Sequence, residues 1–488
     1  MTLRPTPIFA LMLTLALPMT SEARSLQEAV TEMLANNPEL AATRNSQRAA
    51  SEMIGEARAH FYPSLDFSLG GGREWSDTPA TQAAATTGTM TRTERGVTLI
   101  QPIFDGFSNQ SGLTKAEAQA RVAEFEFRVV RENLVQETVA VFIETMKQMK
   151  LMEFAETNVE LHRRIHKGVT ELARLGLGAE IDATQAQARV DLALSELASG
   201  QMEYERVEAS LIRLTGDASV SKEEPTLPAA LLPGDLAQAR QKAVENHPSI
   251  QKLYWELQAA KAEHSGSQAG FWPKVDVAVG MTQNNNSGGM EGLAKNASAM
   301  VRMTYNLFRG GADTSIQNQG IQQVARAEKN WENTRLEVSE RVTSAWQAWK
   351  RLQERISHLD HHLQVTSSVT AAYHEQFQMG QRTLLDLLNS ENELFDARRS
   401  LAETRFELVK SGFVLLGEMG ILTKVLLDKA SGENSTPQKK APPGAVEARA
   451  SDTARPLPTR ASSERNKPRP GDEAPILENI RRYFPDGV

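Results

Sequence analysis

The heptapeptide QPIFDGF at residues 101–107 decides the fold, because a related stretch, YNLFRGG, follows at residues 305–311. Matching residues keep one separation of 204 positions through the sequence that follows each copy: Phe104 and Phe308, Gly106 and Gly310, Gly176 and Gly380, and Asp182 and Asp386. A single register held over roughly seventy helical residues predicts an internal duplication.

The duplication also extends upstream of these heptapeptides, where the separation becomes 210 positions: Leu26, Asn36, Pro38, Phe61 and Pro63 match Leu236, Asn246, Pro248, Phe271 and Pro273. The change in separation is a six-residue deletion, which a loop tolerates. We therefore divide the chain into a first repeat at 24–215, a linker at 216–235 and a second repeat at 236–427.

Each repeat is expected to contain a very long helix. No proline lies between Pro102 and Pro225 or between Pro273 and Pro437, and interior proline costs a helix about 3 kcal/mol. The expected helices are about 100 Å long at 1.5 Å per residue. We place long helices at 108–175 and 312–378, turns at 175–181 and 379–383, shorter helices at 181–214 and 383–415, and initial helices near 26–60 and 236–270, with a break or restart at Pro38.

Apolar residues at heptad spacing support coiled-coil packing of the second long helix: Val342, Ala345, Trp349, Leu352, Ile356, Leu359 and Leu363. Two shorter helices placed end to end match one long helix in length. Each repeat can therefore form a long antiparallel bundle that extends away from a pair of strands.

Alternating apolar residues predict two strands in each repeat, at about 64–73 and 96–104 and at about 274–281 and 298–307. Polar loops at 74–93 and 282–296 connect them. Nine or ten residues is about the length that a tilted strand needs to cross a membrane. The alternative is a small soluble hairpin that packs on a helix.

The two ends of the chain differ from the repeats. Residues 1–23 combine Arg4, an apolar run at 8–17 and small residues Ser21 and Ala23, which is typical of a secretory signal peptide. The proline-rich polar tail at 431–488 is expected to be disordered, and only 474–484 has an amphipathic pattern. We expect an exported chain without a transmembrane helix.

Four strands cannot close a barrel, and an open sheet edge cannot face lipid. Transmembrane strands would therefore have to be shared between chains. Two chains would supply eight strands and a filled interior, whereas three would supply twelve strands and room for a lumen. The helices would continue that lumen as a tube.

The stretches FYPSLDFSLG, QPIFDGF, LGLGAEIDATQAQ and MGQRTLLDLLNSENEL resemble the TolC-like outer-membrane channel family over about residues 26–427. The resemblance implies an α+β membrane protein: a homotrimer with a shared twelve-stranded β-barrel in outer-membrane lipid and a periplasmic α-helical barrel. It implies as partners a periplasmic adaptor protein and an inner-membrane transporter, with an ABC transporter expected. The overall pattern is similar to the branch that serves type I protein secretion, although drug-efflux relatives share the motifs.

The resemblance also assigns roles to the two turns. It implies a pore gate at Asp182, Arg382, Asp386 and Asn389, and adaptor-docking turns at Leu175, Gly176, Leu177, Gly178, Met379, Gly380 and Gln381. Asn389 stands where some members have a second aspartate, and Phe377 stands where a tyrosine can bond the first aspartate. The second acidic ring and that bond are therefore in doubt, and ordinary cap chemistry is the alternative role of the charged residues.

The sequence contains no strong signal for nucleic-acid binding, for a metal site or for catalysis. A net charge of −7 argues against nucleic-acid binding, and the absence of cysteine excludes disulfides and thiolate metal sites. The histidines at 162, 166, 358, 361 and 362 are interpreted as helix-surface residues and not as metal ligands. We expect no enzyme and no cofactor. A soluble periplasmic coiled-coil scaffold and a plain diffusion porin remain as alternatives.

Overall fold

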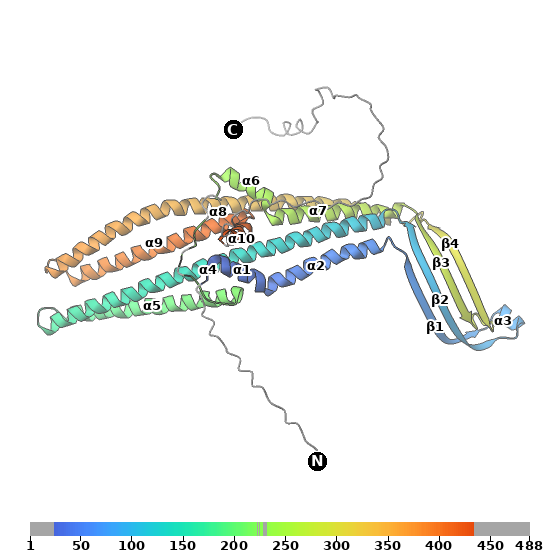
Figure 1. The fold of residues 1–488 in the computed structure, drawn as a ribbon, viewed down its shortest axis with the longest axis horizontal. Helices are drawn as coiled ribbons and strands as arrows, with labels where there is room; N and C mark the ends of the chain where they lie inside the picture. Colours follow the sequence, from blue (N-terminus) through green and yellow to red (C-terminus); the bar gives the residue numbers. More distant parts are fainter. Residues whose placement is uncertain (1–23, 222, 224, 228–231, 434–488) are drawn as a thin grey trace, which may run out of the picture. The chain divides into compact units, whose positions relative to one another are not determined.

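The computed structural model describes residues 24–433 apart from 222, 224 and 228–231 (Figure 1). The expected signal peptide at 1–23 lies outside the described residues, as does the expected disordered tail from 434 onward. The described part contains four strands and a set of long helices, and this combination confirms the expected fold class.

In the first repeat, α1 (Leu26–Asn36) and α2 (Pro38–Ala59) precede the strands, whereas α4 (Ser108–Arg174) and α5 (Glu180–Thr215) follow them. The break between α1 and α2 occurs at Pro38, as expected. Pro38 opens α2, and the Asn37 side chain accepts hydrogen bonds from the backbone N–H groups of Glu39 and Leu40. A proline is tolerated there because the first N–H groups of a helix have no intrahelical partner.

The second repeat follows the same order. It consists of α6 (Leu236–Asn246), α7 (Pro248–Ser267), the short 3₁₀ helix η2 (Gln268–Phe271), two strands, α8 (Ala312–Gln378) and α9 (Leu384–Glu418). The helices α4 and α8 have 67 residues each, so each is about 100 Å long. No helix in the described part of the chain is long and apolar enough to cross a membrane.

Each long helix is accompanied by shorter helices along its length (Figure 1). α4 contacts α2 toward the strands and α5 toward the opposite end, and α8 contacts α7 and α9 in the same way. Contact between α4 and α7 joins the two repeats side by side. The hairpins α4–α5 and α8–α9 end in turns that lie far from the sheet (Figure 1).

The four strands form one antiparallel sheet in the order β1-β2-β3-β4. They are β1 (Ser64–Ser76), β2 (Gly88–Phe104), β3 (Lys274–Asn285) and β4 (Leu293–Thr304). The β2–β3 ladder joins the two repeats, with Val97 opposite Met281 and Leu99 opposite Val279. β1 and β4 form the two outer edges and have no further partner strand within the described chain.

The strand boundaries differ from those expected from the sequence. The region 74–93, expected to be a loop, contains the end of β1, the short helix α3 (Pro79–Ala83) and the start of β2. Likewise, β3 and β4 extend into the expected loop at 282–296, and β4 ends at Thr304 instead of 307. The hydrophobic pattern stops before the ladder does, because polar cross-strand pairs continue it: Arg92 on β2 bonds Glu74 on β1 at 2.8 Å.

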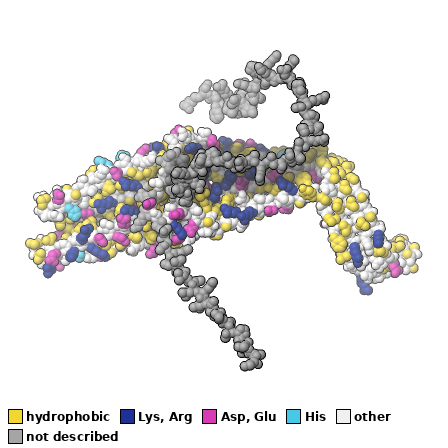
Figure 2. Space-filling view, in the orientation of Figure 1, with side chains coloured by type: hydrophobic (Ala, Val, Ile, Leu, Met, Phe, Trp, Pro, Cys, Tyr) yellow, Lys and Arg dark blue, Asp and Glu magenta, His cyan; other side chains and the backbone are white. Residues whose placement is uncertain are grey.

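Apolar side chains are exposed on the sheet (Figure 2). On β1, Leu65, Phe67 and Leu69 are each about 70% exposed, and on β4 Val301 and Met303 are similarly exposed. The alternation places them on one face of each strand. A contiguous apolar surface of this kind indicates contact with lipid or with another protein.

The main hydrophobic core lies midway along the helices, where α1, α4, α9 and α10 (Leu422–Glu433) meet. α10 was not expected, and it overlaps the first residues of the tail placed at 431–488. Leu422 and Leu426 bury their side chains in this core, which fixes the helix there. The apolar pattern of α10 covers too few residues to be recognised in the sequence.

Glu132 of α4 holds the start of α10. Its carboxylate accepts hydrogen bonds from the backbone N–H groups of Leu422, at 2.8 Å, and Thr423, and from the Thr423 hydroxyl. Glu132 is only 7% exposed. Burial raises the pKa of its carboxyl above the ordinary value of 4.5, although the hydrogen bonds from Thr423 and Leu422 oppose this.

We expect Glu132→Met to lower the free energy of unfolding by about 1–3 kcal/mol, because it leaves buried N–H groups of α10 without an acceptor. Glu132→Gln should cost much less at pH 7, since glutamine keeps an acceptor oxygen and removes a charge that burial disfavours. Thermal unfolding in detergent measures both. Equal losses of stability for the two variants would contradict the capping role.

Candidate functional site: the hairpin tips

The two turns expected to dock an adaptor have the same backbone geometry. At the end of α4, Leu177 N–H donates to Leu172 O at 2.9 Å and Gly176 N–H donates to Ala173 O at 3.0 Å. At the end of α8, Gln381 and Gly380 make the equivalent bonds to Gln376 and Phe377. Gly176 and Gly380 have φ values of 71° and 72°. Both ends are therefore Schellman motifs, whose left-handed residue is best supplied by glycine.

All seven residues of these turns are exposed: Leu175, Gly176, Leu177, Gly178, Met379, Gly380 and Gln381. Three of them present large apolar side chains to solvent, and Leu177 is 75% exposed. A small, rigid and apolar tip on each hairpin is suited to binding another protein.

Asp386, expected in the pore gate, also caps the helix that follows the turn. Thr383 is the N-cap of α9, and its hydroxyl accepts from Asp386 N–H while the Asp386 carboxylate accepts from Thr383 N–H, each at 3.2 Å. This is a capping box. Hydrogen bonds from the Thr383 side chain and backbone hold the pKa of Asp386 below its ordinary value, so the carboxylate is charged at neutral pH.

The equivalent position in the first repeat lacks this cap. Ala179 is the N-cap of α5 and offers no side-chain oxygen, so Asp182 lies at the third helical position without a capping box. No hydrogen bond or ion pair involves the Asp182 side chain within residues that the structure describes. The two aspartates are related by the duplication but are held differently.

Arg382 forms no hydrogen bond or ion pair with Asp182 or Asp386 within the described residues. Its Nε donates to Gln376 Oε1 at 3.0 Å, and its guanidinium lies 4.4 Å from the centre of the Tyr373 ring. Both partners are on α8, so the side chain folds back along its own hairpin. A cation–π contact with an exposed ring is worth about 0.5–1 kcal/mol.

Asn389 connects the two hairpins. Its side-chain oxygen accepts a hydrogen bond from Arg189 of α5 at 3.2 Å. Close to the tips, a small apolar cluster from α4, α5 and α9 makes a second connection through Val169, Ala186, Leu384 and Leu388, and Phe377 of α8 packs against it. Phe377 therefore contributes an apolar contact, and it lacks the hydroxyl with which a tyrosine could bond an aspartate.

The sequence did not predict that polar residues are buried next to this cluster. His162 was expected at the helix surface, which is wrong, since it is 2% exposed. His166 is half-buried, whereas His358, His361 and His362 are exposed as expected. Nothing distinguishes His162 from the other histidines in the sequence alone, because its burial depends on helices from both repeats.

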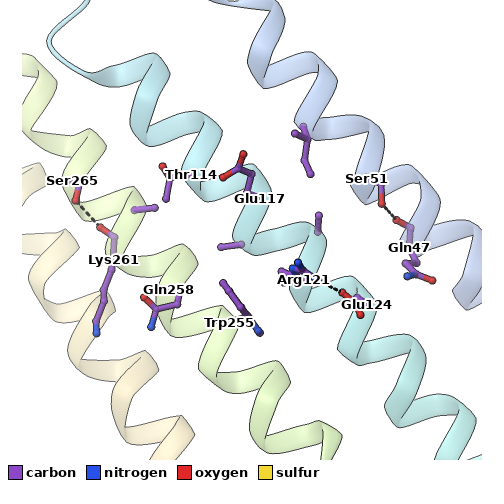
Figure 3. Close-up of a pocket in the computed structure, with 14 residues that line it drawn as sticks. Gln47, Ser51, Thr114, Glu117, Arg121, Glu124, Trp255, Gln258, Lys261 and Ser265 are labelled. Atoms are coloured by element: carbon purple, nitrogen blue, oxygen red, sulfur yellow. Dashed lines mark hydrogen bonds and ion pairs between the residues drawn. The ribbon is translucent and has the colours of Figure 1, made fainter. Parts of the chain in front are cut away.

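A groove of about 760 Å³ lies closer to the sheet, between α2, α4 and α7 (Figure 3). Gln47 and Ser51 of α2, Arg121 of α4 and Trp255 of α7 contribute to its wall, and Arg121 pairs with Glu124 at 2.7 Å. It contains none of the expected gate or docking residues. Its mixed polar lining has no feature that selects a ligand.

Comparison with known proteins identifies the family to which the chain belongs. A model of the family described as outer membrane efflux protein matches residues 29–217 and 239–411. The outer membrane protein TolC of Escherichia coli K12 is 22% identical over 433 residues, which cover 83% of this chain and 84% of TolC. The alkaline protease secretion protein AprF of Pseudomonas aeruginosa is 21% identical over 411 residues, which cover 81% of this chain and 84% of AprF.

Solved structures share the fold. The crystal structure of the Campylobacter jejuni CmeC outer membrane channel aligns with a TM-score of 0.74 at 16% identity, covering 86% of this chain and 94% of CmeC. The resemblance to TolC-like channels is thereby confirmed, and the soluble scaffold is wrong. The protein is a non-enzymatic outer-membrane channel with a periplasmic helical extension, and it belongs to the outer membrane efflux protein family.

Proposed function

We propose that the chain is the outer-membrane exit duct of a type I protein secretion system. Membership of the efflux channel family supports a conduit in a tripartite system, and similarity to AprF, named for alkaline protease secretion, supports a protein as cargo. The second candidate is small-molecule efflux, which the name of the family favours. In both cases an inner-membrane transporter supplies the substrate, and for protein cargo we propose an ABC transporter.

We propose that the channel is a homotrimer, because the sheet of one chain has two open edges. β1 and β4 each present unpaired backbone groups within the described chain, and exposed apolar residues occupy the same strands. Such edges are costly in lipid unless another strand pairs with them. Pairing β4 of one copy with β1 of the next closes a ring, and three copies give twelve strands, enough for a lumen.

We propose the tips as the adaptor-docking surface and the gate. The exposed Leu175, Leu177 and Met379 supply an apolar contact area, and the glycines at 176 and 380 fix the shape of each turn. Asp386, held in its capping box, would place one carboxylate per copy around the narrow end of the tube, where Asp182 contributes a second and less constrained charge. Arg382 and Asn389 then act by fixing the hairpins.

Replacing both turn glycines tests the docking surface. The variant Gly176→Val, Gly380→Val should abolish export, because a β-branched residue resists a positive φ and distorts each tip. The control Gly200→Val lies inside α5 with open space around it and should export normally. Export is measured as cargo in the culture medium, and membrane insertion as trimer in detergent extracts. Normal export by the double variant would contradict docking at the tips.

Asp386 variants test the gate. In planar bilayers, Asp386→Asn and Asp386→Ala should both lower cation selectivity and weaken block by multivalent cations, since each removes the ring charge. Asparagine keeps an acceptor for the Thr383 N–H, so only alanine should also weaken the capping box at the start of α9. The control Asp360→Asn removes an exposed charge on α8 that pairs with Arg405. Unchanged cation selectivity in Asp386→Asn would show that Asp386 does not line the pore.

Deleting the gene separates the two cargo classes. Loss of one or a few proteins from the culture medium, with unchanged sensitivity to toxic small molecules, is the expected result for a secretion duct. Increased sensitivity to small molecules, with an unchanged set of extracellular proteins, would overturn the secretion proposal and favour efflux. Reintroduction of the intact gene should reverse either change.

A further inference from the structure

A buried polar layer lies between the hairpins α4–α5 and α8–α9, next to the apolar cluster of the tips. His162 of α4 is at its centre and is 2% exposed. The charges of Arg189 of α5 and Glu391 of α9 influence the protonation of the His162 ring, and the Asn392 side chain forms a hydrogen bond with that ring. Its Nδ1 atom is buried and has no hydrogen-bond partner among the described residues. An unpaired buried polar atom is costly and rare in native proteins, so it calls for a structural or functional explanation.

Hydrogen bonds extend the layer across all four helices. Arg189 of α5 donates to Asn389 of α9 at 3.2 Å, which links the hairpins directly. Within the second hairpin, His374 of α8 bonds the Glu391 carboxylate, which is 7% exposed, and the Thr370 hydroxyl donates to Ser390 O at 3.0 Å. Glu391 therefore faces a histidine from each hairpin.

The surroundings of His162 favour its neutral ring. Burial lowers the pKa of His162 below its ordinary value of 6.5, and the positive charge of Arg189 lowers it further. Glu391 and the hydrogen bond to Asn392 act in the opposite direction but do not reverse the shift.

We infer that these side chains form an acid-sensitive latch, which holds the two hairpins together at neutral pH and releases them when His162 takes up a proton. The latch supplements the apolar contacts that the hairpins make near the tips. The cluster at the tips has only Val169, Ala186, Leu384 and Leu388 as buried members in the described chain, whereas the core midway along the helices has many more. That release opens the channel rests on the proposed function.

The sign of the effect follows from linkage. A histidine whose pKa is depressed in the latched state binds fewer protons there than in the released state, where its pKa returns to about 6.5. Acidification below that value therefore favours release, by up to about tenfold in the equilibrium constant per pH unit. Above pH 7 both states hold a neutral ring, and the latch no longer responds to pH.

Spin labels on the tips test the latch in the full-length protein. The chain has no cysteine, so Leu177→Cys and Met379→Cys allow labelling of the two exposed turns without background. In detergent, pulsed dipolar spectroscopy should show the distances between labels lengthening or broadening from pH 7.5 to pH 5. His162→Gln in the labelled protein should remove this response, because glutamine is polar but does not titrate.

The matched control is His166→Gln, one helical turn further along α4, where the ring has a hydrogen bond with Thr170 of the same helix. It should keep the full pH response. An unchanged response in His162→Gln, or an equal loss in both variants, would overturn the latch. A trimer of normal size in every variant shows that a lost response is not a folding defect.

Secretion separates the latch from the proposed function. If the distances respond to pH through His162 but deletion of the gene leaves the extracellular proteins unchanged, the secretion proposal fails and the latch stands. If deletion removes proteins from the culture medium but the label distances are the same from pH 7.5 to pH 5, the latch fails and the secretion proposal stands.

Discussion

The backbone groups at the two outer edges of the sheet impose the constraint on which the rest of the structure depends. Within the described chain β1 and β4 each pair on one side only, and their exposed leucine, phenylalanine, valine and methionine side chains suit a lipid environment. Lipid offers no hydrogen bonds to an open edge. A single chain therefore cannot be the working unit, and the duplication supplies only one segment of a closed wall.

The same duplication determines how the helices are arranged. Because β2 of the first repeat pairs antiparallel with β3 of the second, the helix that follows β2, α4, lies beside the helix that precedes β3, α7. Toward the hairpins, α4 packs against α9 of the second repeat. Midway, Glu132 of α4 fixes α10 against the bundle, so a residue of the first repeat caps a helix at the end of the second.

The tips show how two copies of one motif can diverge in local structure. Their Schellman turns are equivalent, with glycine in the left-handed conformation at both 176 and 380. The helices that follow are not equivalent, because Thr383 provides a cap for α9 and Ala179 provides none for α5. Asp386 is thus part of a capped helix start, whereas the Asp182 side chain has no hydrogen bond or ion pair within the described residues.

The sequence by itself determined the duplication, the long helices, the four strands and the turn glycines, since these depend on local propensity and on spacing along the chain. It did not determine the full strand lengths, because the polar ends of β1 and β2 are held by cross-strand pairs such as Arg92 and Glu74. Similarly, the orientation of Arg382 toward Tyr373 and the burial of His162 depend on which helices lie nearby. Only the tertiary structure decided these features, because each needs a neighbour that the sequence does not place in space.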